Sequence, residues 1–233
     1  MRVPAKVNLQ LSVGPLGDDG FHEVVSVFQA VSIFDDVSVR HAPESEGITL
    51  TASGPTSTGV PMDSTNLAYK AAELMALRYG VSTDLAIHLK KAIPVAGGMA
   101  GGSADAAGTL VACDALWQLN LTRDELMSLA AQLGSDISFP LVGGTAIGRG
   151  RGEDVTSLLT RGEIHWVFAV SAEGLSTPKI YKVFDEMNPN PVEPKIPTEL
   201  IAALTSGDIK TAAKLMVNDL QAPAISQRPV LAR

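Results

Sequence analysis

The sequence predicts an α+β protein with two domains, and three features of the chain lead to this prediction. Apolar residues alternate over 85–89, which is the period of a half-buried strand. They recur at helical spacing over 106–117, after a glycine-rich turn. The character of the sequence changes near residues 161–163, and we place a domain boundary at about residue 155. The expected domains are therefore residues 1–155 and 156–233.

The composition bounds the class of protein. Of 233 residues, 45% are hydrophobic and 18% are charged, as in globular proteins. The net charge of −7 argues against a nucleic-acid partner, because a sequence-independent nucleic-acid binder needs positive charge. Cys113 is the single cysteine, which excludes an internal disulfide and a cysteine metal cluster. Because the chain has no apolar run of about 18 residues and no N-terminal signal core, we expect a soluble cytoplasmic protein with no membrane partner.

The chain begins with strand patterns. Residues 2–13 alternate apolar side chains with polar ones that share the other face of a predicted strand, namely Lys6, Asn8 and Gln10. A solvated face is the ordinary interpretation of such residues. Residues 24–39 are rich in β-branched side chains and predict a long strand or a bent pair. His22 stands beside an aromatic residue at the entrance of that strand, which makes it a candidate for stacking on a ring. Residues 48–52 predict another short strand.

Helices follow in the first domain. Residues 64–80 predict a helix whose buried face carries Leu67, Ala71, Leu74 and Leu77. Thr122 and Glu125 form a capping box at the start of another helix, which ends at Gly134. Residues 143–152 are a second glycine-rich segment with two arginines.

The second domain is predicted to be mostly helical. Residues 164–170 predict a strand, and a helix with proline in its first turn begins at Ser176. Residues 188–197 contain four prolines and predict a linker. Thr198 is expected to cap the next helix, and Asp208 is expected to open the last one.

The glycine-rich turn between strand and helix is the strongest functional signal. It reads IPVAGGMAGGSADAA over residues 93–107, with two Gly-Gly pairs. Glycine lets backbone N–H groups approach a ligand without a side-chain clash. The N–H groups of a first helical turn lack internal partners and carry partial positive charge. We therefore predict a phosphate-binding loop in which Ser103 starts the helix, although a plain tight turn would use the same residues. The loop is not a Walker motif, because Ser103 stands where the lysine should be.

Several segments resemble the GHMP kinases, a family of small-molecule kinases. The matching segments are residues 4–9 (PAKVNL), 20–23 (GFHE), 65–67 (TNL), 94–107, 134–139 (GSDISF) and 176–181 (STPKIY). The resemblance extends from Val3 to about Leu220. It implies a ribosomal-protein-like N-terminal domain and an incomplete ferredoxin-like C-terminal domain.

The resemblance implies that the γ-phosphate of ATP is transferred to the 2-hydroxyl of a cytidine-diphosphate-linked methylerythritol, in the non-mevalonate route of isoprenoid biosynthesis. Lys6 matches the basic lysine of the family and Asp136 matches its catalytic aspartate. A carboxylate can orient a hydroxyl and accept its proton, and a nearby ammonium offsets charge on the transferring group. Mg²⁺ is the expected metal, with no protein ligand assigned.

The resemblance also implies binding residues. For ATP these are Pro94, Gly97, Gly98, Met99, Ala100, Gly101, Gly102, Ser103 and Ala104 at the phosphates, with Asn66, Leu67 and Lys90 or Lys91 at the adenine. For the substrate they are Phe21, His22 and Tyr181, whose rings would face the cytosine, and Asn8, which would help hold the substrate. Related enzymes tend to carry Tyr at position 21 and Phe at position 181, so an aromatic face is kept in both places.

The chain departs from the family pattern after Leu220. The family's third motif, Gly-Ser-Gly-x-Thr, does not occur there. The closing strands of the second domain are also absent, so we expect either a C-terminally truncated version or a natural shortened protein with impaired catalysis. In both cases we expect the second domain to be less stable than the first. The protein is expected to be a monomer or a homodimer.

Two other functions remain open on the sequence. One is a GHMP kinase that acts on homoserine or on a mevalonate derivative. The aromatic residues Phe21, His22 and Tyr181 argue against it, because those substrates carry no base. The other is a non-catalytic nucleotide- or RNA-binding relative. The net charge and the presence of Lys6 and Asp136 argue against that function.

Overall fold

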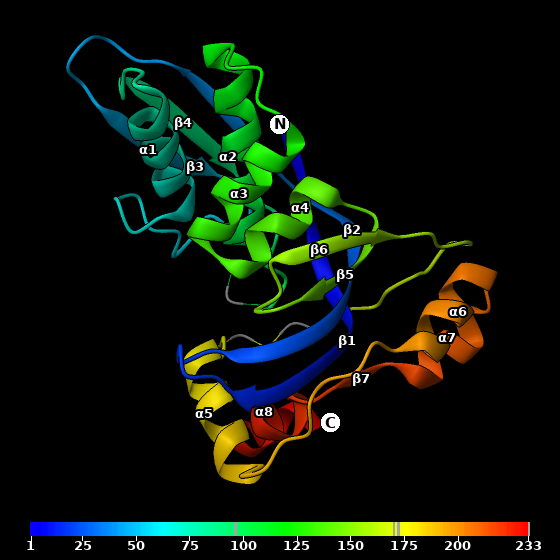
Figure 1. Ribbon diagram of the computed structural model, residues 1–233. Helices are drawn as coiled ribbons and strands as arrows, with labels where there is room; N and C mark the ends of the chain where they lie inside the picture. The colour runs from blue at the N-terminus through cyan, green and yellow to red at the C-terminus, as the bar shows by residue number, and fades with distance from the viewer. Residues whose placement is uncertain (96, 170, 172, 233) are drawn as a thin grey trace. The chain divides into compact units, whose positions relative to one another are not determined.

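The computed structural model of the chain describes residues 1–95, 97–169, 171 and 173–232 (Figure 1). In these residues the strands are β1 (Arg2–Leu16), β2 (His22–His41), β3 (Ile48–Ser53), β4 (Leu85–Lys90), β5 (Thr145–Arg149), β6 (Asp154–Leu158) and β7 (Val217–Asn218). The α-helices are α1 (Leu67–Tyr79), α2 (Gly101–Trp117), α3 (Arg123–Leu133), α4 (Ser138–Val142), α5 (Thr177–Met187), α6 (Thr198–Ser206), α7 (Ile209–Leu215) and α8 (Gln221–Gln227). Short 3-10 turns are η1 (Ser135–Ile137) and η2 (Pro229–Ala232). The predicted α+β class is confirmed.

Two compact units make up the chain. The first unit comprises residues 1–6 and 30–143, and the second comprises residues 7–29 and 144–233. The long strands β1 and β2 therefore contribute to both units. The predicted domains 1–155 and 156–233 divide the chain differently, and they stay a prediction.

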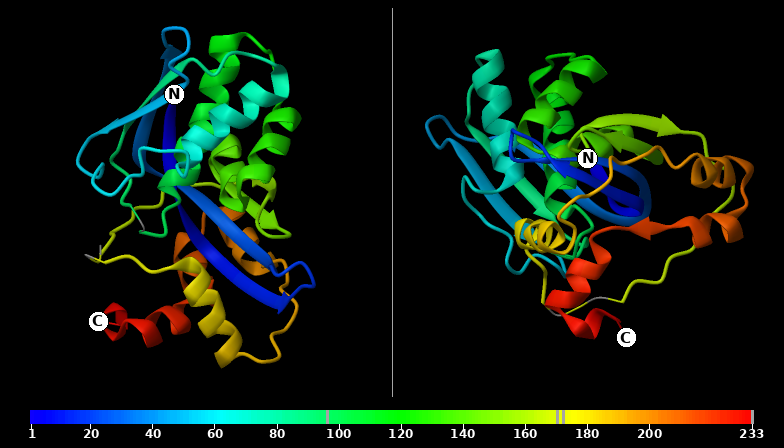
Figure 2. Two further views of the ribbon diagram at one scale, coloured as in Figure 1. Left: turned by 90° about the vertical axis from the view of Figure 1, so that its left-hand side faces the viewer. Right: turned by 60° about the horizontal axis from the view of Figure 1, so that its bottom comes forward.

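The first unit is a sheet covered by helices. Strand β2 pairs antiparallel with β4, so that Val37 lies opposite Leu89, and β4 pairs in parallel with β3. Helices α1, α2 and α3 lie on one face of these strands (Figure 2, left). The alternating apolar residues of β4 are buried, as predicted. Gly108 explains how closely α2 approaches, since a Cβ there would lie 2.8 Å from Val3 and 2.9 Å from Val37.

The buried face of α1 differs from the prediction. Leu77 is 82% exposed, whereas the buried residues are Ala68, Ala71, Ala72, Met75 and Ala76. Alanines let α1 pack close to α2, so the small residues take the interior and the large Leu77 points away. The helix ends at Gly80 as predicted, but it begins at Leu67 rather than at Ser64, because Asn66 is its N-cap. The capping box of Thr122 and Glu125 is confirmed at the start of α3.

The second unit holds the remaining strand pairs. Residues 26–29 of β2 pair antiparallel with β5, which also pairs with β6. The short β7, which was not predicted, pairs in parallel with β1, so that Gln10 lies opposite Val217. Helices α6 and α7 pack on Leu9 and Val27 through an apolar cluster of Leu200, Ala203, Leu204 and Ala212.

Two predictions in the second unit are wrong. Residues 164–169 form no strand; Val170 lies outside the described residues. Their alternation instead serves side-chain packing, because Ile164 and Trp166 lie against the apolar cluster and Trp166 Nε1 donates to Gln29 Oε1 at 3.0 Å. Thr198 is the first residue of α6 rather than its cap, which is Pro197. Asp208 caps α7 as predicted, with its carboxylate accepting from Thr211 N.

Within the described residues, no helix has the length and apolar character needed to cross a membrane.

Candidate active site

The glycine loop enters α2 two residues earlier than predicted. Helix α2 begins at Gly101, after Ala100 takes a left-handed backbone conformation with φ of +56°. The amide of Ala104 already donates to Ala100 O at 2.8 Å, so Ser103 is the third helical residue and not the first. The N–H groups of residues 101–103 precede this first intrahelical bond. They are therefore the amides that a bound anion could reach.

Lys6 and Asp136 meet beside this loop. Lys6 Nζ lies 3.4 Å from Asp136 Oδ2, with the Lys6 side chain 8% exposed and the Asp136 side chain 42% exposed. The backbone N–H of Lys6 donates to the carbonyl of Met99, in the loop, at 3.2 Å. The first unit thus brings together the loop, an ammonium and a carboxylate. Because the carboxylate is partly open to solvent, a substrate hydroxyl can reach it.

Buried neighbouring residues and a backbone hydrogen bond hold the turn that carries Asp136. Asp136 lies in η1 directly after Gly134, and the amide of Ile137 donates to Gly134 O at 3.1 Å. Ile137 and Phe139 are fully buried, so they hold the turn while Asp136 faces outward.

The residues predicted for adenine lie near the same loop. Asn66 is buried, where its Oδ1 accepts from Ala68 N and its Nδ2 donates to Pro61 O, each at 2.8 Å. Leu67 Cδ1 is 3.8 Å from the position of a Cβ on Gly102, so Leu67 lies beside the loop. Lys90 is exposed, whereas Lys91 is buried and held by two carboxylates. Of the two lysines, only Lys90 is open to a ligand.

Lys91 belongs to a buried charge cluster that the sequence prediction missed. Its ammonium contacts Asp35 Oδ2 and Asp105 Oδ2. One signal could have revealed this cluster, because both aspartates interrupt apolar stretches of a predicted strand and helix, where a charge is rarely buried without a partner.

In the second unit, His22 is fixed on all sides. Its ring stacks on Tyr181 with centroids 5.3 Å apart, and it meets the edge of Phe184 at 5.9 Å. His22 Nδ1 lies 2.8 Å from Gly14 O, and Nε2 lies 3.2 Å from Asp185 Oδ1. His22 and Tyr181, both predicted to bind substrate, are therefore brought together.

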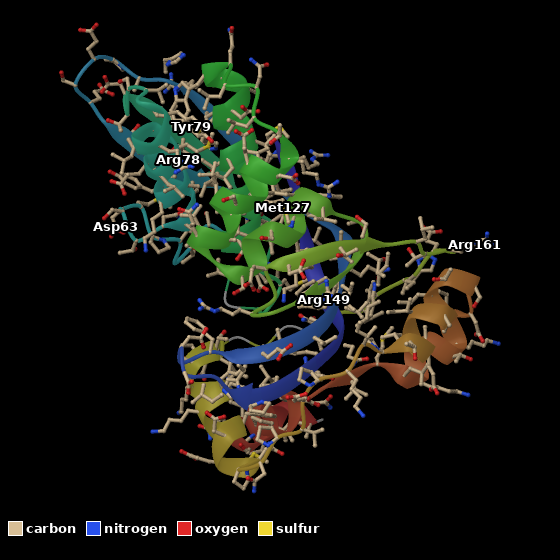
Figure 3. All side chains as sticks on the ribbon, viewed as in Figure 1. Asp63, Arg78, Tyr79, Met127, Arg149 and Arg161 are labelled. Carbon is tan, nitrogen blue, oxygen red and sulfur yellow. The ribbon has the colours of Figure 1, made fainter. Side chains whose placement is uncertain are left out.

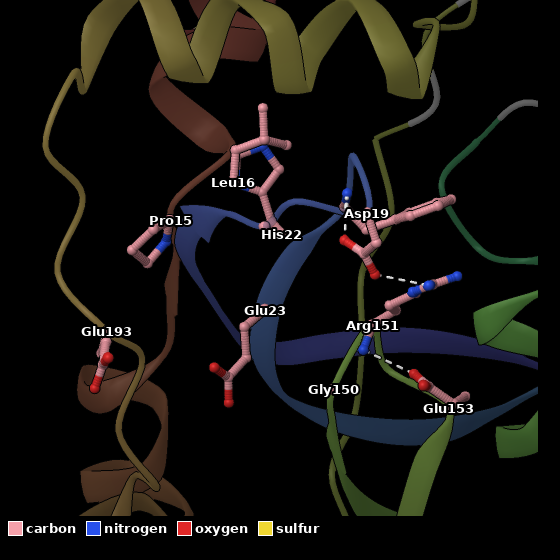
Figure 4. A pocket seen from close by; sticks show the side chains of 11 residues that line it. Pro15, Leu16, Asp19, His22, Glu23, Gly150, Arg151, Glu153 and Glu193 are labelled. Atoms are coloured by element: carbon pink, nitrogen blue, oxygen red, sulfur yellow. Dashed lines mark hydrogen bonds and ion pairs between the residues drawn. The ribbon is translucent and has the colours of Figure 1, made fainter.

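Phe21 opens onto a cavity of about 510 Å³ in the same unit (Figure 4). The Phe21 ring is half exposed, and Arg151 Cζ lies 4.1 Å from its centroid. Arg151 Nη2 also contacts Asp19 Oδ2 at 2.7 Å. The amide of Phe21 and the guanidinium of Arg151 hold the pKa of Asp19 below its usual value. An aromatic wall with a charged rim suits a planar polar ligand such as a nucleobase.

Asn8 also lies in the second unit. Its Nδ2 donates to Ser26 Oγ at 2.6 Å, which orients the side chain.

A smaller cavity of about 300 Å³ lies between α1 and α3, lined by Arg78, Tyr79, Glu125, Ser128 and Leu129. Figure 3 labels Arg78 and Tyr79 at the end of α1. None of the predicted site residues lines it. In the described part of the chain, no three His, Cys, Asp or Glu side chains gather as a metal site.

Comparison with known proteins agrees with this geometry. The family model "GHMP kinases N terminal domain" matches residues 66–144. A 4-diphosphocytidyl-2-C-methyl-D-erythritol kinase of Streptomyces coelicolor is 49% identical in an alignment that covers 99% of this chain and 77% of that protein. A kinase of the same name from Cutibacterium acnes is 51% identical, over 99% of this chain and 76% of that protein.

The chain belongs to the GHMP kinase family. A crystal structure of a 4-(cytidine 5'-diphospho)-2C-methyl-D-erythritol kinase superposes on this GHMP kinase with a TM-score of 0.69 and 30% identity, over 100% of this chain and 80% of that one. A mevalonate kinase of L. major has a TM-score of 0.68 at 16% identity, over 92% of this chain and 72% of that one, and so shares the fold. The predicted family and the small-molecule kinase class are confirmed, with ATP as the phosphate donor.

Proposed function

We propose that this GHMP kinase transfers the γ-phosphate of ATP to the 2-hydroxyl of 4-diphosphocytidyl-2-C-methyl-D-erythritol, in the non-mevalonate route to isoprenoid precursors. Relatives about half identical to the chain carry the name of that kinase. The observation that carries the chemistry is the distance of 3.4 Å between Lys6 Nζ and Asp136 Oδ2. Lys6 lies on β1, and its backbone N–H donates to the carbonyl of Met99 in the glycine loop. The cytoplasmic location and the monomer or homodimer stay predictions.

In the proposed mechanism, each group of the first unit has one task. The amides of residues 101–103 hold the phosphate tail of ATP. They are the first N–H groups of α2, and the dipole of the helix favours negative charge at this end. Asp136 orients the substrate hydroxyl and accepts its proton as the new O–P bond forms. The bond between the γ-phosphorus and the β–γ bridging oxygen breaks in the same step, and ADP leaves with that oxygen. Lys6 offsets the negative charge on the transferring phosphoryl group.

We propose Mg²⁺ as the accompanying ion. Phosphate oxygens and waters usually supply most ligands of Mg²⁺ in kinases, with one or two protein carboxylates. The ion would offset charge on the phosphates.

The aromatic residues of the second unit are proposed to bind the cytosine. The exposed ring of Phe21 and the stacked pair of His22 and Tyr181 support this role. Homoserine and mevalonate carry no base, so a kinase for either would gain nothing from these rings. The test is to assay ATP turnover with the cytidyl substrate, homoserine and mevalonate in parallel. Turnover with the cytidyl substrate is expected, and turnover with only one of the other two alcohols would reject the proposal.

Removing an aromatic ring should weaken the binding of the cytidyl substrate more than the binding of ATP. Tyr181→Ala is expected to raise the KM for that substrate about tenfold or more, because stacking on a base contributes about 1–3 kcal/mol. His22→Ala should raise the same KM indirectly, because the His22 side chain is only 5% exposed and its ring stacks on Tyr181. The KM for ATP should change less. Tyr181→Phe keeps the ring and serves as the matched control, with a KM near that of the unaltered enzyme. An equal rise in both KM values would make the rings structural.

A larger side chain in the glycine loop should weaken the binding of ATP. A Cβ at Gly102 would meet nothing closer than 3.8 Å, so Gly102→Ala fits the fold. The methyl group would stand between the loop amides and the phosphates. We expect the Kd for ATP to rise about tenfold, or roughly 1.4 kcal/mol, with an unchanged melting temperature. Calorimetric titration with ATP measures the Kd. An unaltered Kd would place the phosphates elsewhere.

A further inference from the structure

Three buried charges lie at the root of the glycine loop, and the proposed mechanism uses none of them. Asp35 comes from β2, Lys91 directly follows β4, and Asp105 lies in α2. Their exposed fractions are 0%, 2% and 2%. These three side chains are called the buried triad below.

The buried triad binds the backbone at the entrance of the loop, directly after β4. Asp35 Oδ1 accepts from the amides of Ala92 at 2.6 Å and Ile93 at 2.9 Å, immediately before the loop. Asp35 Oδ2 contacts the Lys91 ammonium. The backbone at the entrance of the loop is therefore tied to β2 by three contacts to one carboxylate.

The same ammonium also holds the far end of the loop. Lys91 Nζ contacts Asp105 Oδ2, one turn into α2. It also lies 3.5 Å from the position of a Cβ on Gly101, the first helical residue. Lys91 thus links the entrance of the loop to the helix that receives it.

Stability alone does not account for such a cluster. Burying three charges costs free energy, and packed apolar residues of similar volume are often as stable or more so. Asp105 Oδ1 is buried without a hydrogen-bond partner among the described residues, so the hydrogen-bonding capacity of the cluster is incompletely used. What the triad supplies is a fixed geometry on both sides of the amides of residues 101–103.

We propose that Asp35, Lys91 and Asp105 are positioning residues that hold the phosphate loop in the shape that binds ATP. This inference rests on the proposed function, because it assumes that the loop binds the nucleotide. The triad does not touch the phosphates itself. It acts by fixing the amides that do.

The charge of the triad gives the proposal a readout that simple packing would not give. Burial raises the pKa of Asp105 to about 7, against the attraction of Lys91 and with the repulsion of Asp35 added. Lys91 and Asp35 are the charged groups that act on Asp105. Below that pH the triad is neutral, and above it the triad carries one negative charge under a loop that binds phosphates. ATP affinity should therefore fall as the pH rises through about 7.

The experiment measures the Kd for ATP of the full 233-residue chain by calorimetry between pH 6 and pH 8.5. Asp35→Asn weakens the grip on the loop entrance and is expected to raise the Kd about tenfold at every pH. Asp105→Asn keeps the shape without the titrating charge, so its Kd should depend less on pH than that of the unaltered chain. The matched control is Asp84→Asn, at the other end of β4, where the carboxylate accepts from Gly47 N at 2.9 Å. Its Kd and pH profile should match those of the unaltered chain.

The outcomes are distinguishable. If the unaltered chain does not bind ATP, the proposed function and the triad proposal both fail. If it binds ATP and the Asp35 and Asp105 variants match the Asp84 control, only the triad proposal is overturned. If Asp35→Asn does not fold, the pH profile of Asp105→Asn decides, because a merely structural carboxylate would leave that profile unchanged.

Discussion

Replacing Asp136 by asparagine is expected to lower kcat at least a hundredfold while ATP still binds. The amide keeps the shape of the carboxylate but cannot accept the proton of the substrate hydroxyl. General base catalysis typically contributes about 10²–10⁴-fold to the rate. The substitution also removes the negative charge that lies 3.4 Å from the Lys6 ammonium. Single-turnover kinetics with saturating substrates measure the loss, and calorimetry measures ATP binding.

The control for Asp136→Asn is Asp124→Asn, an exposed aspartate in the first turn of α3. It should leave kcat within about twofold, because surface substitutions away from special features change little. Turnover of the Asp136 variant near the control value would reject Asp136 as the base. Loss of ATP binding in the Asp136 variant would instead make this carboxylate a nucleotide ligand.

The parts of the fold that depend on local patterns were predictable. The alternation in β4, the capping box of α3 and the glycine that ends α1 act within a few residues, and each is where it was expected. Residues 164–169 show the limit, because alternation reports which side chains are buried and not whether the backbone finds a pairing strand. The short β7 could not be predicted either, since it depends on the distant edge of β1.

The candidate site was predictable in its parts and not in its arrangement. The amides of residues 101–103 follow from a glycine loop before a helix. The pairing of Lys6 with Asp136 joins residues 130 positions apart, and only family resemblance suggested it. Asp35 and Asp105 interrupt apolar stretches, which indicates that each needs a buried partner, but the sequence does not show that this partner is Lys91. The contact of Arg151 with Phe21 was missed because the two residues lie far apart in the sequence.

Replacing Lys91 by methionine is expected to lower the free energy of unfolding of the first unit by about 3–5 kcal/mol. Methionine fills similar volume, so the loss does not come from a cavity. It comes from two buried carboxylates left without their counter-ion, which is the costly way to break a buried ion pair. Asp35 retains two backbone donors, whereas Asp105 Oδ1 has no hydrogen-bond partner among the described residues. Denaturant titration followed by a probe in the first unit measures the change.

The matched control is Lys90→Met, at the exposed last residue of β4, which should lower the free energy of unfolding by less than about 0.5 kcal/mol. The pH dependence separates charge from packing. The folded pKa of Asp105 is already raised to about 7, and an acid with a raised folded pKa loses stability as the pH rises from its unfolded value near 4 to the folded one. Loss of the Lys91 charge raises that pKa further. The loss of unfolding free energy in Lys91→Met should therefore be smaller at pH 5 than at pH 8, because the carboxyl of Asp105 is neutral at pH 5. A deficit equal to that of Lys90→Met at both pH values would mean that the three side chains are hydrated rather than buried together.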